Sequence, residues 1–163
     1  MFIANTHPRH RQSLDAIDAE TLGIGASQQV MRFLAQRENH AITPLHTLPA
    51  LAGELGVAAI HVKDEGFRLG LGSFKALGGA YAVMRLVLEA AGKRLGRTLD
   101  VADLQTPEVR AIAATMTVTC ATDGNHGRSV AQGAQLVGAQ AAILVHAGVS
   151  DERVAAMRAS VQR

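Results

Sequence analysis

The chain has 163 residues, of which 48% are hydrophobic and 18% charged, so its length suits one domain and its composition excludes a disordered chain. Aromatic residues make up 3% and the net charge is +2, which argues against a nucleic-acid-binding surface. The lone cysteine, Cys120, excludes an internal disulfide and favours a reducing compartment. Neither an export signal nor a membrane span is predicted. We therefore expect a cytoplasmic protein with neither a membrane nor a nucleic acid as its partner.

The first forty residues have the least regular pattern. Ser27 is placed to cap a short helix in which three apolar residues share one face: Val30, Phe33 and Leu34. The Thr43–Leu45 step is predicted to be extended, because the residue before a proline is displaced from the helical region.

A helix is predicted over Thr47–Leu55, with Pro49 in its first turn and Gly56 at its end. Strands and helices then alternate along the chain. The predicted strands are Val57–Val62, Thr115–Cys120 and Ala142–Val145. The predicted helices are Phe74–Ala91 (ended by Gly92), Gly127–Val137 and one that follows Ser150, with 92–110 as a surface connection.

This alternation predicts an α/β fold, in which a mainly parallel sheet is flanked by helices. We expect residues 1–56 to form an N-terminal segment and residues 57–163 to form a βαβαβα portion. With only about three clear strands, the chain is expected to be part of a larger protein.

The loop before the long predicted helix, residues 63–79, contains five glycines. It matches neither the phosphate loop of nucleotide hydrolases nor the dinucleotide fingerprint, in which Lys75 would occupy the third glycine's place. Lys75 stands at the start of an apolar helix, where burial would favour its neutral, nucleophilic form. The alternative is a lysine whose amine reaches solvent from the first helical turn.

A second polar turn, residues 121–127, follows the second predicted strand. Asn125 can both donate and accept hydrogen bonds, and Asp123 could act as a base, although a tight turn also explains these residues. His126 has no partner at zinc-ligand spacing, so no metal site is predicted. Because ligands of parallel sheets lie beyond the carboxyl ends of the strands, Lys75 and this turn are expected to meet at one edge.

Three motifs together resemble the β-family (fold type II) of pyridoxal-phosphate enzymes. They are Lys63-Asp64-Glu65, Ser73-Phe74-Lys75 and Asp123-Gly124-Asn125-His126. The longer runs Gly-Ser-Phe-Lys-Ala-Leu-Gly-Gly-Ala-Tyr and Ala-Thr-Asp-Gly-Asn-His-Gly-Arg are similar to the diaminopropionate ammonia-lyase branch of that family. The resemblance extends from about Thr43 to the end of the sequence.

The resemblance implies a role for each motif residue. Lys75 would bind pyridoxal 5'-phosphate covalently and then act as a base at the substrate Cα. Phe74 would pack beside the cofactor ring, and Asn125 would hydrogen-bond its phenolic oxygen. Asp123 would be a second base on the opposite side of Cα, so that both D- and L-2,3-diaminopropionate could react. The substrate carboxylate would be held by Thr122, Asp123, Gly124, Asn125 and His126.

The implied reaction is an α,β-elimination that yields pyruvate and ammonia, and the implied assembly is a homodimer. Members of the family are about twice this length or more, so the chain is expected to be an N-terminal portion that lacks the C-terminal half of the fold. Two alternatives stay open: a threonine or serine dehydratase of the same family, and a catalytically inactive fragment that acts only as an interaction module.

Overall fold

The computed structural model describes residues 3–161 and divides the chain into two compact units, Met1–Gln36 and Arg37–Arg163. The first unit contains α1 (Ala16–Leu22) and α2 (Ile24–Ala35). Asp15 caps α1 by accepting a hydrogen bond from the amide of Asp18 at 2.8 Å. The prediction that Ser27 caps the next helix was wrong, because α2 begins three residues earlier and the amide of Ser27 donates to the carbonyl of Gly23.

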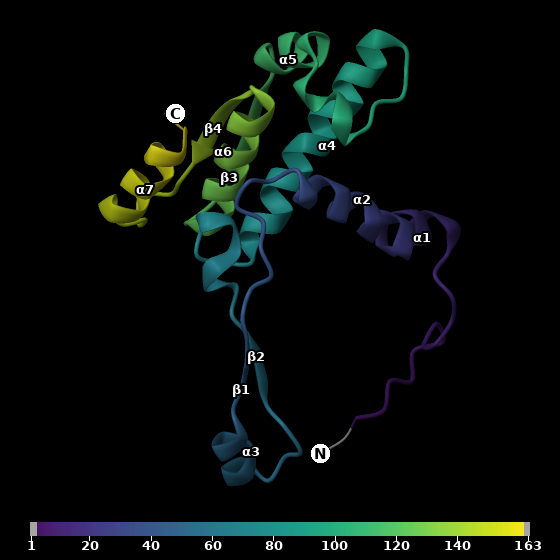
Figure 1. Cartoon of the computed structure of the whole chain (residues 1–163), viewed down its shortest axis with the longest axis vertical. Coiled ribbons are helices and arrows are strands. Elements are labelled where there is room, and N and C mark those ends of the chain that lie inside the picture. Colours follow the sequence, from purple (N-terminus) through teal and green to yellow (C-terminus); the bar gives the residue numbers. More distant parts are fainter. Residues whose placement is uncertain (1–2, 162–163) are drawn as a thin grey trace. The chain divides into compact units, whose positions relative to one another are not determined.

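The second unit contains the remaining elements (Figure 1). In chain order they are β1 (Leu45–Thr47), α3 (Pro49–Leu55), β2 (His61–Lys63), the 3-10 helix η1 (Glu65–Gly70), α4 (Lys75–Leu95), the 3-10 helix η2 (Val101–Gln105), α5 (Pro107–Ala114), β3 (Thr117–Ala121), α6 (Asn125–Val137), β4 (Gln140–Leu144) and α7 (Asp151–Val161). No helix within residues 3–161 has both the length and the apolar character that crossing a membrane requires.

The described strands form two separate two-stranded sheets. Strands β3 and β4 are parallel and are joined through α6, which confirms a βαβ unit. The expectation that the first predicted strand joins this sheet was wrong, because β2 pairs antiparallel with β1, with His46 opposite Val62. The short connection through α3 reverses the chain, and an antiparallel pair needs no long crossover. Helix α3 begins at Pro49, two residues after the predicted start, because Thr47 belongs to β1. It ends as predicted at Gly56, whose φ is 63°.

Several segment boundaries differ from the sequence expectation. Strand β2 begins at His61 and not at Val57, while β3 and β4 are each shifted by one or two residues. Helix α4 continues through Gly92 and ends at Gly96, whose φ of 67° suits a left-handed helix end. The region 92–110 is more than a surface connection: it contains η2, capped reciprocally by Asp100 and Asp103, and it buries Val101 and Leu104. Apolar residues at this spacing anchor the segment to the core.

The core of the second unit is centred on α6, which contacts α4, α7 and both strands of the parallel sheet. Helices α4 and α6 approach closely through small residues. A Cβ at Gly133 would lie 2.7 Å from the Cα of Ala80, and one at Gly79 would lie 2.6 Å from the Oγ of Ser129. Buried Ser129 accepts from the amide of Ala80 at 3.1 Å and donates to the carbonyl of Ala76 at 3.2 Å. The close contact therefore fixes the starts of the two helices side by side.

Candidate active site

Lys75 is the first residue of α4 and follows a sharply turned loop. Gly70 and Gly72 adopt φ values of 72° and 69°, which glycine tolerates better than other residues. The hydroxyl of Ser73 accepts a hydrogen bond from the amide of Lys75 at 3.1 Å. The Lys75 side chain is exposed, which agrees with an amine that reaches solvent from the first helical turn and not with a lysine buried in apolar surroundings. Its neighbour Phe74 is also exposed, which leaves an open space beside the amine.

Asp123 lies in the turn between β3 and α6. The hydroxyl of Thr122 fixes this turn by accepting hydrogen bonds from the amides of Gly124 and Gly127, both at 3.2 Å. A Cβ at Gly127 would lie 2.3 Å from the Cγ2 of Thr122, so only glycine allows this packing. Helix α6 begins at Asn125, two residues before the predicted start, and so includes Asn125 in its first turn.

The Lys75 loop and the Asp123 turn line two adjoining cavities. The first, of about 550 Å³, is lined by Phe74, Lys75, Leu77, Gly78, Gly79, Ala121, Thr122, Asp123 and His126. The second, of about 520 Å³, is lined by Lys75, Asp123, Gly124, Asn125, Arg128, Glu152, Arg153 and Ala156. Lys75 and Asp123 line both cavities, and every residue assigned a role from the sequence lines at least one.

The two motifs meet for a different reason from the one expected. Lys75 follows β2, which lies outside the parallel sheet, so a shared sheet edge does not bring Lys75 to Asp123. The close packing of α4 on α6 does so instead, because each motif stands at the start of one of these helices.

Three charged residues of the second cavity were given no role in the sequence prediction: Arg128, Glu152 and Arg153. Arg128 lies one helical turn after Gly124, a spacing that could have indicated it. Its Nη1 donates to the carbonyl of Leu71 at 3.5 Å, and its buried Nε has no hydrogen-bond partner among the described residues. Glu152 and Arg153 come from α7, and no local pattern links that helix to the site.

The lining residues fit a flat aromatic aldehyde cofactor. A cavity of about 550 Å³ lies in the size range of small-molecule sites, roughly 300–1,000 Å³. A Cβ built at Gly78 or Gly124 would meet no atom within 4 Å, so the backbone leaves room beside Lys75 and Asp123. A lysine amine next to an aromatic ring supplies both a nucleophile and a stacking surface. Among the described residues, no three His, Cys, Asp or Glu side chains are grouped so that they could hold a metal ion.

Comparison with known proteins gives consistent matches. The chain is 40% identical over 122 residues to the diaminopropionate ammonia-lyase of Salmonella typhimurium, an alignment that covers 75% of the chain and 30% of the relative. It is 45% identical over 116 residues to that of Escherichia coli K12, covering 71% of the chain and 28% of the relative. The chain thus spans about 30% of the length of these curated relatives.

Solved structures give the same result. The apo form of Escherichia coli diaminopropionate ammonia lyase matches with a TM-score of 0.69 and 38% identity, covering 82% of this chain and 35% of that one. The same enzyme in complex with an aminoacrylate-PLP azomethine reaction intermediate matches with a TM-score of 0.67 and 37% identity, covering 82% and 32%. These matches confirm the fold type II architecture inferred from the motifs.

A family comparison matches residues 37–160, about three quarters of the chain, to "Pyridoxal-phosphate dependent enzyme". The match includes both helix starts that line the two cavities. The chain therefore belongs to the family of pyridoxal-phosphate dependent enzymes.

Proposed function

We propose that this chain contributes Lys75 and Asp123 to an ammonia-lyase that eliminates ammonia from D- and L-2,3-diaminopropionate and yields pyruvate. The observation that carries the proposal is that these two residues, 48 positions apart in the sequence, line the same two cavities. The names of the relatives support this substrate over a hydroxy amino acid. An aspartate beside the amine favours a substrate with two ammonium groups, since opposite charges attract.

Bound pyridoxal phosphate would supply an electron sink for the electrons released at the substrate Cα. Lys75 would hold that group through its amine and, once displaced by the substrate, would remove the Cα proton. Asp123 would remove it from the other side. Because the D- and L-isomers present the Cα proton on opposite sides, two bases would let one site process both. Loss of the β-amino group as ammonia would complete the elimination, and hydrolysis would release the second ammonia.

The remaining motif residues would bind and orient. Phe74 would pack on the cofactor ring, and Asn125 would donate a hydrogen bond to its phenolic oxygen. The substrate carboxylate would be held by the turn before and at the start of α6, whose amides carry partial positive charge. That turn comprises Thr122, Asp123, Gly124, Asn125 and His126.

We also propose that residues 57–163 carry the lysine and the Asn/Asp turn, with residues 1–56 as an N-terminal segment. The proposed assembly is a homodimer in the cytoplasm. The lone cysteine supports a reducing compartment, and the assembly is proposed from the family resemblance.

The proposal is tested by covalent labelling. The purified chain is mixed with pyridoxal phosphate and reduced with borohydride, and the modified lysine is mapped by mass spectrometry. The chain has only three lysines, Lys63, Lys75 and Lys93, so selectivity is directly measurable. We expect label mainly at Lys75, and no selective label in Lys75→Arg, because arginine stays protonated.

Lys93→Arg is the matched control, since Lys93 lies near the far end of α4 and pairs with Glu89 at 2.6 Å. This variant should keep the wild-type labelling of Lys75. Equal labelling of the three lysines in the wild-type chain would contradict the proposal.

A further inference from the structure

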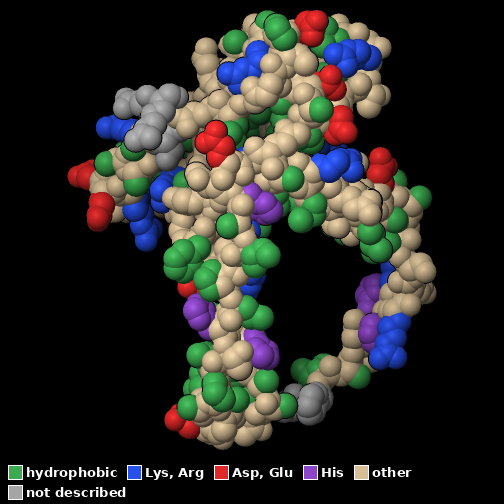
Figure 2. All heavy atoms as spheres, in the orientation of Figure 1, with side chains coloured by type: hydrophobic (Ala, Val, Ile, Leu, Met, Phe, Trp, Pro, Cys, Tyr) green, Lys and Arg blue, Asp and Glu red, His purple; other side chains and the backbone are tan. Residues whose placement is uncertain are grey.

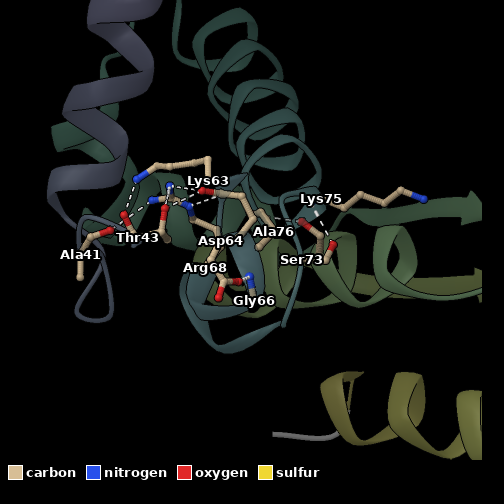
Figure 3. Close-up of polar contacts among 11 residues, drawn as sticks. Ala41, Thr43, Lys63, Asp64, Gly66, Arg68, Ser73, Lys75 and Ala76 are labelled. Atoms are coloured by element: carbon tan, nitrogen blue, oxygen red, sulfur yellow. Dashed lines mark hydrogen bonds and ion pairs between the residues drawn. The ribbon is translucent and has the colours of Figure 1, made fainter. Parts of the chain in front are cut away.

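A cluster of four polar residues lies just before the loop that leads to Lys75. It consists of Thr43, Lys63, Glu65 and Arg68 (Figure 3). None of the four lines either cavity, so none has a place in the chemistry proposed above. Figure 3 shows the Lys75 side chain extending away from the cluster. Any effect of these residues on the reaction must therefore act through the backbone between Arg68 and Lys75.

Glu65 is the acceptor at the centre of this cluster. Its Oε1 accepts from the Thr43 hydroxyl at 2.6 Å and from Arg68 Nη2 at 2.7 Å, and its Oε2 accepts from Arg68 Nε at 2.7 Å. The two side chains of the ion pair are only 20% and 11% exposed, which limits screening by water. The pKa of Glu65 is lowered to about 2. The hydrogen bonds from Arg68 are the largest cause, and the hydrogen bond from Thr43 is the next. A two-point contact between a carboxylate and a guanidinium is strong and fixes geometry.

The cluster also ties backbone segments together. Arg68 Nη1 donates to the carbonyl of Ala41 at 3.2 Å, and the Lys63 amine donates to the carbonyl of Thr43. The amide of Asp64 donates to the carbonyl of Pro44 at 2.9 Å. The chain entering β1 and the chain leaving β2 are thereby fastened to each other at the point where η1 begins.

The backbone that follows Arg68 adopts an unfavourable conformation. Leu69 has a φ of 50°, a region that non-glycine residues seldom occupy, and its side chain is only 2% exposed. Gly70 and Gly72 continue with positive φ. Such conformations persist only where surrounding contacts over-determine them, and they gather at functional sites. The Glu65–Arg68 contact immediately precedes this turn, and Lys75 immediately follows it.

A series of contacts continues from the cluster to the site. The amide of Leu71 donates to the carbonyl of Arg68 at 3.1 Å, and the carbonyl of Leu71 accepts from Arg128 of α6 at 3.5 Å. Ser73 then holds the amide of Lys75. Each hydrogen bond restrains the next part of the loop, so the position of Arg68 affects the position of the backbone at the start of α4.

From this arrangement we propose that Glu65 and Arg68 are positioning residues, which fix the backbone of residues 69–74 and so direct the Lys75 amine into the cavities that it shares with Asp123. The inference rests on the proposed function, because it assigns Lys75 the reactive amine. Glu65 and Arg68 touch neither the substrate nor the cofactor in this role.

The test uses the full chain and two readouts, of which the first needs no cofactor. Hydrogen exchange followed by mass spectrometry measures the opening of residues 66–74, and borohydride labelling with pyridoxal phosphate measures the preference for Lys75 over Lys93. Glu65→Gln removes the charge while keeping the shape. We expect exchange in 66–74 to rise by at least about tenfold and the Lys75:Lys93 labelling ratio to fall by about tenfold.

The matched control is Glu54→Gln, which removes the carboxylate of an exposed glutamate in α3 and leaves all three lysines with their partners. It should leave both readouts at wild-type values. If Glu65→Gln fails to fold, Thr43→Val replaces it, because this change removes the hydroxyl that bridges Glu65 and Arg68 without changing the size of the side chain. A smaller shift in the same direction is expected in both readouts.

The outcomes separate this inference from the proposed function. Unchanged exchange in residues 66–74 would overturn the inference. Raised exchange with an unchanged labelling ratio would overturn it as well, because the cluster would then stabilise the loop without positioning the amine. A wild-type chain that labels its lysines equally would contradict the proposed function and, with it, the positioning role. If the wild-type chain is labelled mainly at Lys75, and Glu65→Gln changes neither the labelling ratio nor the exchange, only the positioning role would be contradicted.

Discussion

Asp123 is an exposed carboxylate in a turn whose backbone is held by the hydroxyl of Thr122. Its side chain is therefore presented on a fixed support, next to the cavities and across from the start of α4. In the proposed role of Asp123 as a general base, this support would matter, because proton transfer depends on geometry before it depends on pKa.

Asp123→Asn should separate the two isomers of the substrate. We expect turnover of the isomer whose Cα proton faces Asp123 to fall by about 10²–10⁴-fold, the usual worth of a positioned base, with the other isomer much less affected. Kinetic assays with D- and L-2,3-diaminopropionate, threonine and serine measure this. Asp18→Asn, an exposed aspartate in α1, serves as the control. Equal rates for variant and wild type on both isomers would remove the second-base role.

Glu65 makes the stability of the second unit sensitive to acid. Its pKa in the folded chain is about 2 against an ordinary value of 4.5, because Arg68 and Thr43 hydrogen-bond the ionised form. A lowered folded-state pKa contributes stability above the ordinary value, and this contribution is lost as the pH falls from about 4.5 toward 2. Thermal unfolding across that range should therefore show a steeper decline for the wild type than for Glu65→Gln. Parallel curves for the two proteins would count against the ion pair as a source of stability.

At the scale of elements, the contact between α4 and α6 decides where the site lies. Gly79, Ala80, Ser129 and Gly133 let the two helix backbones approach, and this approach sets the starts of α4 and α6 against each other. The sequence predicted a helix here, and in the structure the side of α4 that includes Met84 and Leu88 is buried. The partner of that side was not evident from the pattern, because small residues specify close packing only when the facing helix is known.

Gly133→Ala tests this contact. A Cβ there would lie 2.7 Å from Ala80 Cα and 3.1 Å from Val83 Cβ, so the helices must separate. We expect the free energy of unfolding to fall by about 1–3 kcal/mol, as in overpacked cores, with reduced labelling of Lys75. Denaturant unfolding gives the first quantity.

Gly53→Ala in α3 is the matched control, because a Cβ there meets no atom within 4 Å. This helical glycine should instead gain about 0.5–1 kcal/mol from its higher helix propensity. The interpretation fails if both substitutions shift stability in the same direction.

At the scale of the whole molecule, the large apolar side chains of some segments are much more exposed to solvent than those of others. In the segment formed by β1, α3 and β2, five large apolar residues are 40–63% exposed: Leu45, Leu51, Leu55, Val57 and Val62. Figure 2 shows hydrophobic side chains at the surface of this segment. Only Ala52 is buried within α3. Several exposed apolar side chains in one segment promote association with other apolar surfaces.

We expect the chain to bind an apolar fluorescent dye through this segment. The double variant Leu55→Ser, Val62→Thr should lower dye fluorescence clearly, while its secondary structure by circular dichroism stays as in the wild type. Leu86→Ser removes one exposed leucine of α4 and should have little effect. Equal loss of fluorescence in both variants would show that the dye does not report on this segment.

The sequence by itself determined the family, the βαβ unit and the residues of both motifs, because local patterns carry each of these. Glycine-rich turns, helix starts and a lysine or aspartate at a set place in a motif are properties of neighbouring residues. The first helix start was assigned within one residue and the second within two. Residues of two of the three motifs, those around Lys75 and Asp123, line the cavities, whereas Lys63-Asp64-Glu65 does not.

Only the tertiary structure decided how these parts meet. The partner of β2, the exposure of Lys75, the share of α7 in the second cavity and the cluster around Glu65 depend on contacts between residues far apart in the chain. Thr43 and Glu65, for example, are 22 positions apart and meet only because β1 and β2 pair in one register. Strand pairing and helix packing are chosen by the burial of whole surfaces, which no local pattern specifies.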